Sequence, residues 1–239
     1  MIDRFILPYI GMIKLGRLNA MDLVAWMGAL RRLNVTDGLR RKSHTVLRNA
    51  LNSAVKLQLI TNNPCGAIDP PKTRKPEIKW LELNECERLV EVCKGHRLGD
   101  AVILAAITGM RRGEIPGLKW SAVNLSETLL TVREIVDERP GVFIRLKPPK
   151  TECSRRVMML GDLAIEVLRR RREKVIAENM PPREVQPVFP HRQGTQCRGR
   201  SFYHCVFIRL RDAAGISENF TFHGLRHTQA SLMVAPVSP

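Results

Sequence analysis

Two arginines, a lysine and a histidine in the second half of the chain have side chains that could bind a phosphate group and help to transfer it. Two guanidinium groups can neutralise the charge on the non-bridging oxygens of a phosphate as it becomes five-coordinate. A histidine can donate a hydrogen bond or exchange a proton, and a lysine can protonate a leaving oxygen. Taken singly, each such residue is more often a surface charge or a satisfied polar group, so their combination carries the argument. The residues are Arg111, Lys150, His223 and Arg226.

The local sequence places these side chains where they could meet an anion. Arg111 directly follows the apolar segment 100–110, at the expected start of the next helix, where free amides and the helix dipole favour negative charge. Arg226 lies three residues after His223, so both side chains are expected to leave one helix on the same face. Lys150 lies in an expected turn between two strands, from which it could reach into a groove.

The elements that must position these residues are mostly helices. β-branched residues and the turn at 139–141 also predict a hairpin, followed by a third strand at 155–160. The fold class is therefore mostly α with a small antiparallel sheet. The four arginines at 169–172 are typical of a solvated helix face. Apolar spacing predicts helices over 19–33, 38–60 (ended by Asn62, Asn63 and Pro64), 83–95, 100–110, 162–180 (with Asp162 as cap), 201–216, and a short stretch near 223.

The composition favours an anionic partner. The formal net charge is +16 and the isoelectric point is near 10.3, which together with 44% hydrophobic residues indicates a globular nucleic-acid-binding protein. An acidic membrane surface is the second candidate partner, but we expect no amphipathic anchor, signal peptide or membrane span. We expect free thiols in a reducing cytosol and no metal site, because no C-x-x-C pair or zinc spacing occurs among Cys65, Cys86, Cys93, Cys153, Cys197 and Cys205.

A basic, proline-rich stretch, "DPPKTRKPEIKW", separates two parts of the chain. Proline withholds an amide, so we expect an extended linker at 69–79 between a helical unit, 1–68, and a mixed unit, 80–239. The alternative is a surface loop within one domain. The first 75 residues hold 13 basic against four acidic residues, and the other 164 hold 26 against 19. Candidate DNA contacts in the more basic part are Arg40, Arg41, Lys42, Arg48, Lys72, Arg74 and Lys75.

Three motifs, in this order and spacing, resemble those of the tyrosine recombinases, the phage integrase family. "LITNNPCGAIDPPK" also resembles the end of the family's helical core-binding domain, so the resemblance covers nearly the whole chain. The first motif, T-G-x-R-x-x-E, is matched by Thr108, Gly109, Arg111 and Glu114. The second, a lysine before a strand, is matched by Lys150, Thr151, Arg156 and Val157. The third, H-x-L-R-H-T, is matched by His223, Leu225, Arg226, His227 and Thr228.

The resemblance implies a core-binding domain and a mixed α/β catalytic domain that enclose double-stranded DNA, with other recombinase protomers as further partners. A tyrosine hydroxyl would attack the phosphodiester and form a 3′-phosphotyrosyl link, without metal or other cofactor. Arg111 and Arg226 would clamp the phosphate, Lys150 would protonate the leaving 5′-oxygen and His223 would assist proton transfer. Glu114 and His227 would support them. DNA integration and recombination by a mobile element, in a bacterial or phage-infected cytoplasm at the nucleoid, is the implied setting.

The sequence departs from the family in its tyrosines. The family places a second His or Trp, and then the nucleophilic Tyr, after the third motif. The tyrosines here are Tyr9, in the basic helical part, and Tyr203, which precedes His223. We therefore expect no nucleophile in these 239 residues and no strand cleavage by them alone. Two alternatives remain: a DNA-binding protein without chemistry, and a nicking enzyme similar to type IB topoisomerases.

Overall fold

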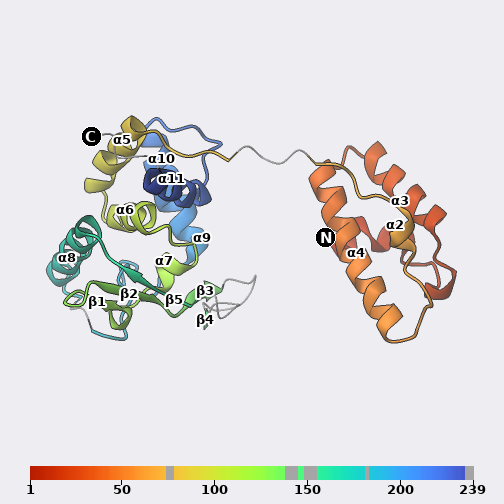
Figure 1. The fold of residues 1–239 in the computed structure, drawn as a ribbon, viewed down its shortest axis with the longest axis horizontal. Coiled ribbons are helices and arrows are strands. Elements are labelled where there is room, and N and C mark those ends of the chain that lie inside the picture. Colours follow the sequence, from red (N-terminus) through yellow and green to blue (C-terminus); the bar gives the residue numbers. More distant parts are fainter. Residues whose placement is uncertain (74–77, 138–144, 148–154, 181–182, 235–239) are drawn as a thin grey trace. The chain divides into compact units, whose positions relative to one another are not determined.

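The computed structural model describes residues 1–73, 78–137, 145–147, 155–180 and 183–234. The chain divides into two compact units, Met1–Glu77 and Ile78–Pro239, which run from red to orange and from yellow to blue in Figure 1. The division falls inside the segment expected to be a linker, and residues 69–73 form neither helix nor strand. Lys150, Arg74 and Lys75 lie outside the described residues.

The first unit is helical, and its core lies between its two long helices. Leu23 and Trp26 of one helix are buried with Leu47 and Leu51 of the other. The Trp26 indole donates a hydrogen bond of 2.6 Å to the carbonyl of Phe5, which holds the N-terminal helices on this core. The elements are α1 (Ile2–Phe5), α2 (Leu7–Ile10), the 3₁₀ turn η1 (Leu15–Arg17), α3 (Ala20–Arg32), α4 (Asp37–Lys56) and the 3₁₀ turn η2 (Pro64–Ala67).

Helix α4 ends at Lys56, earlier than the expected end near residue 60. Gln58 adopts a positive φ of 58°, and the amide of Leu59 bonds back to the Ala54 carbonyl at 2.9 Å, which closes the last turn. Leu59 is exposed, so its apolar spacing does not reflect a core position. Asn63 does not end α4 but caps η2, because its side chain accepts a hydrogen bond from the Cys65 amide.

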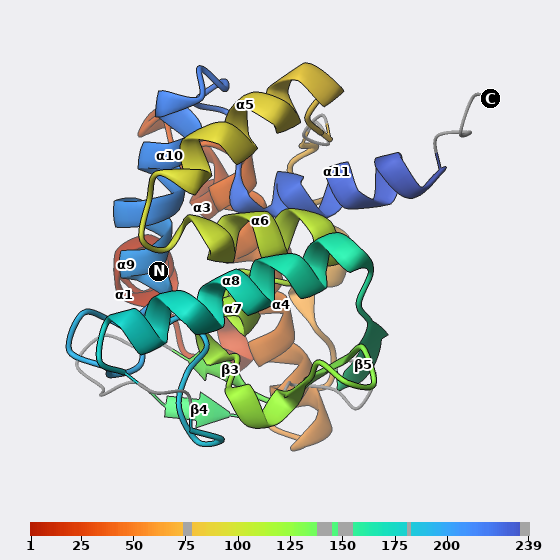
Figure 2. The same cartoon turned by 90° about the vertical axis from the view of Figure 1, so that its left-hand side faces the viewer.

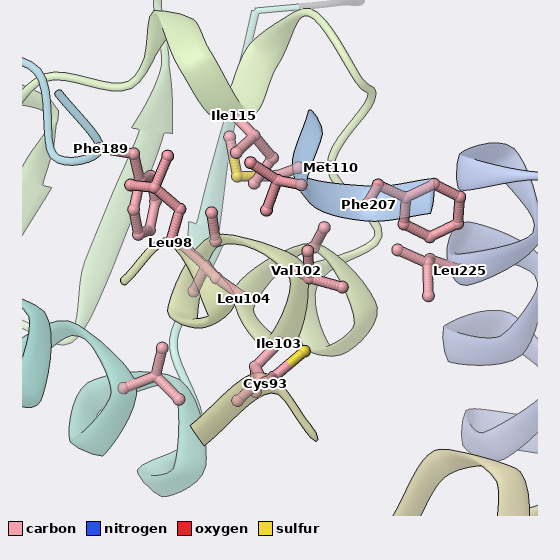
Figure 3. Close-up of a cluster of buried hydrophobic side chains, with 14 of the residues drawn as sticks. Cys93, Leu98, Val102, Ile103, Leu104, Met110, Ile115, Phe189, Phe207 and Leu225 are labelled. Atoms are coloured by element: carbon pink, nitrogen blue, oxygen red, sulfur yellow. The ribbon is translucent and has the colours of Figure 1, made fainter. Parts of the chain in front are cut away.

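The second unit is built around the apolar helix α6 (Gly99–Thr108). Residues 99–105 are all buried, and Figure 2 shows α6 between α8 on one side and α5 and α11 on the other. Figure 3 shows Val102 facing Phe207 and Leu225, and Ile103 beside Cys93. The other helical segments are α5 (Leu83–Lys94), α7 (Glu114–Gly117), η3 (Trp120–Ala122), α8 (Asp162–Ala177), α9 (Gly199–Phe202), the π-helical η5 (Tyr203–Phe207), α10 (Ile208–Ala213) and α11 (Phe222–Val234).

Two small antiparallel sheets complete this unit. One has the order β1 (Val123–Asn124), β2 (Leu129–Val132) and β5 (Arg156–Met159), with Val132 opposite Arg156. The other pairs β3 (Ile135–Asp137) with β4 (Arg145–Lys147). The expected hairpin and third strand are thus confirmed, and so is the mostly helical fold class.

The four arginines at 169–172 do not form a uniformly solvated face. Arg171 is fully buried: its Nε donates to the Val188 carbonyl at 3.0 Å and its Nη1 to the Arg97 carbonyl at 3.2 Å. Arg170 and Lys174 both bind the buried carboxylate of Asp100. Residues 169–172 therefore differ in exposure, because position 171 lies on the side of α8 that faces the core. Asp162 was expected to cap this helix, but it is the first helical residue of α8, and the N-cap is Gly161.

We predict that Arg171→Met lowers the free energy of unfolding by about 2–4 kcal/mol, because the buried Val188 carbonyl and the part-buried Arg97 carbonyl lose their donor. Arg172→Met, which removes the same charge from the exposed neighbour, should change it by less than about 0.5 kcal/mol. Urea unfolding of the two variants measures the difference. Equal losses would show that position 171 matters only as a charge on the helix.

Candidate phosphate-binding site

The site begins where α6 ends. Gly109 closes this helix in the left-handed conformation, with a φ of 62°, and its amide bonds to the Ala105 carbonyl at 2.9 Å. Its own carbonyl accepts a hydrogen bond of 2.9 Å from Nη1 of Arg226 on α11. A Cβ at Gly109 would lie 3.0 Å from the Gln229 side chain and 3.5 Å from that of Arg226. Glycine here therefore permits both the turn and the close approach of α11.

Arg111 lies in the loop after this turn and is held by Glu114. Helix α7 starts only at Glu114, so Arg111 is not at the start of a helix as expected. Its amide is not free either, because it donates to Glu114 Oε2 at 2.8 Å, while its Nη1 donates to Oε1 at 3.0 Å. The Glu114 side chain is 1% exposed and that of Arg111 49% exposed. The Arg111 guanidinium is thus anchored through one of its nitrogens, and about half of the side chain is open to solvent.

A second arginine, Arg156, approaches the same carboxylate from β5. Its Nη1 and Nη2 donate to the two oxygens of Glu114 at 3.0 and 2.8 Å. Burial by itself would raise the pKa of Glu114, but the hydrogen bonds from Arg156, the hydrogen bond from the Arg111 amide, the charge of Arg156 and the hydrogen bond from the Arg111 side chain hold this pKa below its ordinary value. Glu114 is therefore an ionised, buried support for two arginines.

The histidines of the third motif lie on the first turns of α11. The rings of His223 and His227 are 4.7 Å apart and nearly perpendicular. Burial lowers the pKa of His223, and the charges of His227, Arg226 and Arg111 lower it further. Burial and the charges of Arg111 and Arg156 also lower the pKa of Arg226. These mutual effects arise because the cationic groups lie close together, as an anion-binding site requires.

The remaining residues of the third motif hold α11 in place. Thr228 Oγ1 accepts a hydrogen bond from the Leu81 amide at 2.9 Å and donates to the Gly224 carbonyl at 3.0 Å. Leu225 is fully buried in the core. A Cβ at Gly224 would lie 2.4 Å from the Phe220 ring. The motif thus combines cationic residues with the packing that orients them.

The structure brings together five of the six expected catalytic and supporting residues. Lys150 lies outside the described residues. Sequence reasoning missed the bond between Arg156 and Glu114; the alternation of a strand could have indicated it, since Arg155 is exposed and Arg156 is half-buried. The residues that meet are Arg111, Glu114, His223, Arg226 and His227.

The basic residues expected to contact DNA in the first unit lie mainly on the outer face of α4. Arg41, Lys42 and Arg48 are exposed there, and Lys72 is exposed beyond η2. Arg40 is half-buried and paired with Asp37. Over the described part of the chain, no helix is long and apolar enough to cross a membrane, and no three His, Cys, Asp or Glu residues form a group that could hold a metal ion.

Residues 79–238 match the phage integrase family. The chain belongs to this family. A XerC-like tyrosine recombinase of Caldanaerobacter subterraneus subsp. tengcongensis is 28% identical over 206 residues, and the match covers 77% of this chain and 52% of that protein. The integrase of Salmonella phage P22 is 24% identical over 203 residues, and the match covers 81% of this chain and 46% of that protein. The chain therefore spans about half the length of these relatives.

Solved integrase structures share the fold. The Tn1549 transposon integrase, in complex with transposon right-end DNA, matches 93% of this chain and 75% of its own with a TM-score of 0.75 and 17% identity. A λ integrase tetramer bound to a Holliday junction matches 94% of this chain and 60% of its own, with a TM-score of 0.64 and 20% identity. At such identities the likeness concerns the fold of this phage integrase family member.

We predict that Arg111→Gln raises the pKa of His223 toward its ordinary value, because one of the charges that lower it is lost. NMR titration of the imidazole signals measures this pKa. Arg112→Gln is the matched control, since Arg112 is also exposed but its guanidinium lies over the Tyr203 ring. An unchanged pKa in Arg111→Gln would contradict the proximity of Arg111 and His223.

Proposed function

We propose that this chain carries the DNA-binding and phosphate-activating residues of a site-specific tyrosine recombinase, which breaks and rejoins double-stranded DNA. The observation that carries the proposal is the contact of Arg226 with the Gly109 carbonyl, two residues before Arg111. It sets two guanidinium groups from distant parts of the sequence beside His223. Family membership favours a recombinase over the topoisomerase-like alternative.

In the proposed mechanism, Arg111 and Arg226 bind the non-bridging oxygens of the scissile phosphate and stabilise the charge of its five-coordinate state. A tyrosine hydroxyl attacks phosphorus, its proton passes to a base, and the 5′-oxygen leaves as a hydroxyl group. Lys150 protonates that leaving oxygen, and His223 assists proton transfer. Glu114 fixes Arg111, and His227 supports His223. No step requires a metal ion or another cofactor.

The proposed partners are duplex DNA and further recombinase protomers, in a bacterial or phage-infected cytoplasm at the nucleoid. The exposed basic residues of α4, with Arg40, Lys72, Arg74 and Lys75, would contact the DNA backbone. Integration of a mobile element is the proposed setting, since the relatives include the integrases of phage P22 and, by fold, of the transposon Tn1549.

Neither tyrosine of the chain suits the role of nucleophile. Tyr203 is half-buried on η5, its ring stacks on Phe207 with centroids 5.6 Å apart, and Arg112 lies 5.1 Å from its ring centroid. Tyr9 packs against the core of the first unit. An in-line attack needs the hydroxyl within about 3–3.5 Å of phosphorus.

We predict that duplex DNA binding weakens steeply with salt and that α4 contributes to it. Replacing Lys42 and Arg48 together by Gln should reduce the slope of log affinity against log salt by about 2, because each phosphate contact releases about 0.9 counterion. The matched control replaces Arg31 and Arg32, two exposed basic residues of α3, by Gln. Fluorescence anisotropy over a salt series measures both slopes. Equal slopes for the two double variants would show that Lys42 and Arg48 of α4 do not contact the DNA phosphates.

We also predict that these 239 residues bind a nicked suicide duplex without forming a covalent adduct, because neither tyrosine is positioned for attack. A denaturing gel after incubation with labelled DNA shows whether protein and DNA are linked. An adduct that disappears in Tyr203→Phe but persists in Tyr9→Phe would identify Tyr203 as the nucleophile and overturn the prediction.

A further inference from the structure

We propose that Arg156 is a positioning residue of this site, which holds Arg111 in place through Glu114. The inference rests on the proposed function and assigns Arg156 a role that the phosphate-binding residues do not fill. Arg156 touches neither His223 nor Arg226 by any hydrogen bond among the described residues. Its influence on the site therefore passes through the shared carboxylate and through its charge.

The geometry around Glu114 shows why Arg156 acts through it. Each carboxylate oxygen accepts two hydrogen bonds, one from each arginine: Oε1 from the two Nη1 atoms, both at 3.0 Å, and Oε2 from the Arg111 amide and Arg156 Nη2, both at 2.8 Å. Both terminal nitrogens of Arg156 thus face the carboxylate in a two-pronged contact. Because both of its terminal nitrogens bind Glu114, this guanidinium does not offer the same pair of donors to a phosphate. Lysine could not replace it, because an ammonium lacks the planar pair of donors.

The charge of Arg156 also keeps Glu114 able to hold Arg111. Without Arg156, the buried Glu114 carboxylate would have Arg111 as its cationic partner, and the Arg111 side chain is half exposed. Glu114 would then favour its neutral form more strongly than it does with both arginines present. Protonation would turn one oxygen into a donor, and the carboxyl group could no longer accept both bonds from Arg111. The loss of Arg156 would therefore release the Arg111 guanidinium as the pH falls.

Other charged groups near Glu114 do not replace Arg156. From α11, Arg226 lies near enough for the Glu114 charge to act on its pKa, but it bonds to the Gly109 carbonyl. Glu114 also lines a cavity of about 170 Å³, and the other charged residues in the wall of this cavity are Lys119, Arg133 and Glu134. Lys119 and Glu134 pair with each other at 2.6 Å.

The position of Arg156 in the chain gives the contact a second consequence. Arg156 is the first residue of β5 and lies opposite Val132 of β2. The segment that contains Lys150 leads directly into this strand in the sequence. The bond from Arg156 to Glu114 therefore ties the strand that follows the proposed general acid to the loop that carries the phosphate-binding Arg111.

The first test follows Glu114 itself in the 239-residue chain, without DNA. The carboxyl ¹³C signal of Glu114 is titrated by NMR in the wild type, Arg156→Met, Arg156→Lys and Arg155→Met. The midpoint should move to higher pH in Arg156→Met and also in Arg156→Lys, which keeps the charge without the fork. It should stay unchanged in Arg155→Met, which alters the exposed residue just before this strand. The lysine variant decides the question where methionine prevents folding, and an unchanged midpoint in both overturns the proposal.

The second test separates positioning from a purely structural role. At pH 5.5, Arg156→Met should weaken duplex binding roughly threefold to tenfold more than Arg155→Met does, and at pH 8 the difference should shrink. In an Arg111→Gln background, Arg156→Met should cause no further loss beyond that of Arg155→Met. Equal losses with and without Arg111, or a loss independent of pH, would make Arg156 a direct DNA contact or a structural residue. A wild type without salt-dependent binding would overturn the proposed function, while the Glu114 titration would still decide the role of Arg156.

Discussion

The site depends on one buried carboxylate. Glu114 is 1% exposed, and an ion removed from water in this way costs several kcal/mol unless hydrogen bonds and opposite charge compensate it. Four N–H groups from two arginines provide that compensation. Because Arg111 comes from the loop after α6 and Arg156 from β5, the carboxylate can be buried only when helix and sheet are both in place. The arrangement of Arg111 is thus a consequence of the folded core.

Carboxylates also pair with basic side chains away from the site, and this pairing determines where positive charge is left without a counter-charge. Asp100, fully buried at the start of α6, binds Arg170 and Lys174, and Glu178 binds Arg97. These carboxylates neutralise basic residues that the core has to accommodate. At the site, one carboxylate serves Arg111 and Arg156, while Arg226 bonds to a carbonyl, which carries no charge. Within the described residues the site therefore retains net positive charge, which an anion would neutralise.

The helices and the strands could largely be predicted from the sequence, because their apolar periodicity is local. α3 and α6 follow that pattern, and α6 ends at Thr108, where Gly109 adopts the left-handed conformation that glycine favours after a helix. The expected end of α4 was wrong, because Leu59 continues the apolar spacing but lies in solvent. An apolar residue marks a core position only when a partner covers it, and that partner is not visible in the local sequence.

The site was harder to predict, because its residues come from distant parts of the chain. No local spacing joins Arg111 to Arg226; only the family resemblance did so. Arg156 was matched to a motif, yet its contact with Glu114 depends on which face of β5 meets α7. Arg171 shows the same limit, since four consecutive arginines conceal the one that faces inward. The inward direction of Arg171 could have been predicted from the helical spacing of Val167, Leu168 and Val175, which are buried on the same face of α8.

The charge of the site also bears on when His223 carries a proton. In the free protein, burial and the neighbouring cations lower its pKa, so the imidazole is neutral around neutral pH. A bound phosphodiester would bring negative charge into the same space and favour the imidazolium form. By linkage, an anion that raises the pKa of His223 must bind more tightly when His223 is protonated, and its binding takes up a proton at pH values between the free and bound pKa. In the proposed mechanism the histidine is therefore charged mainly in the presence of its substrate, when a proton is needed for transfer.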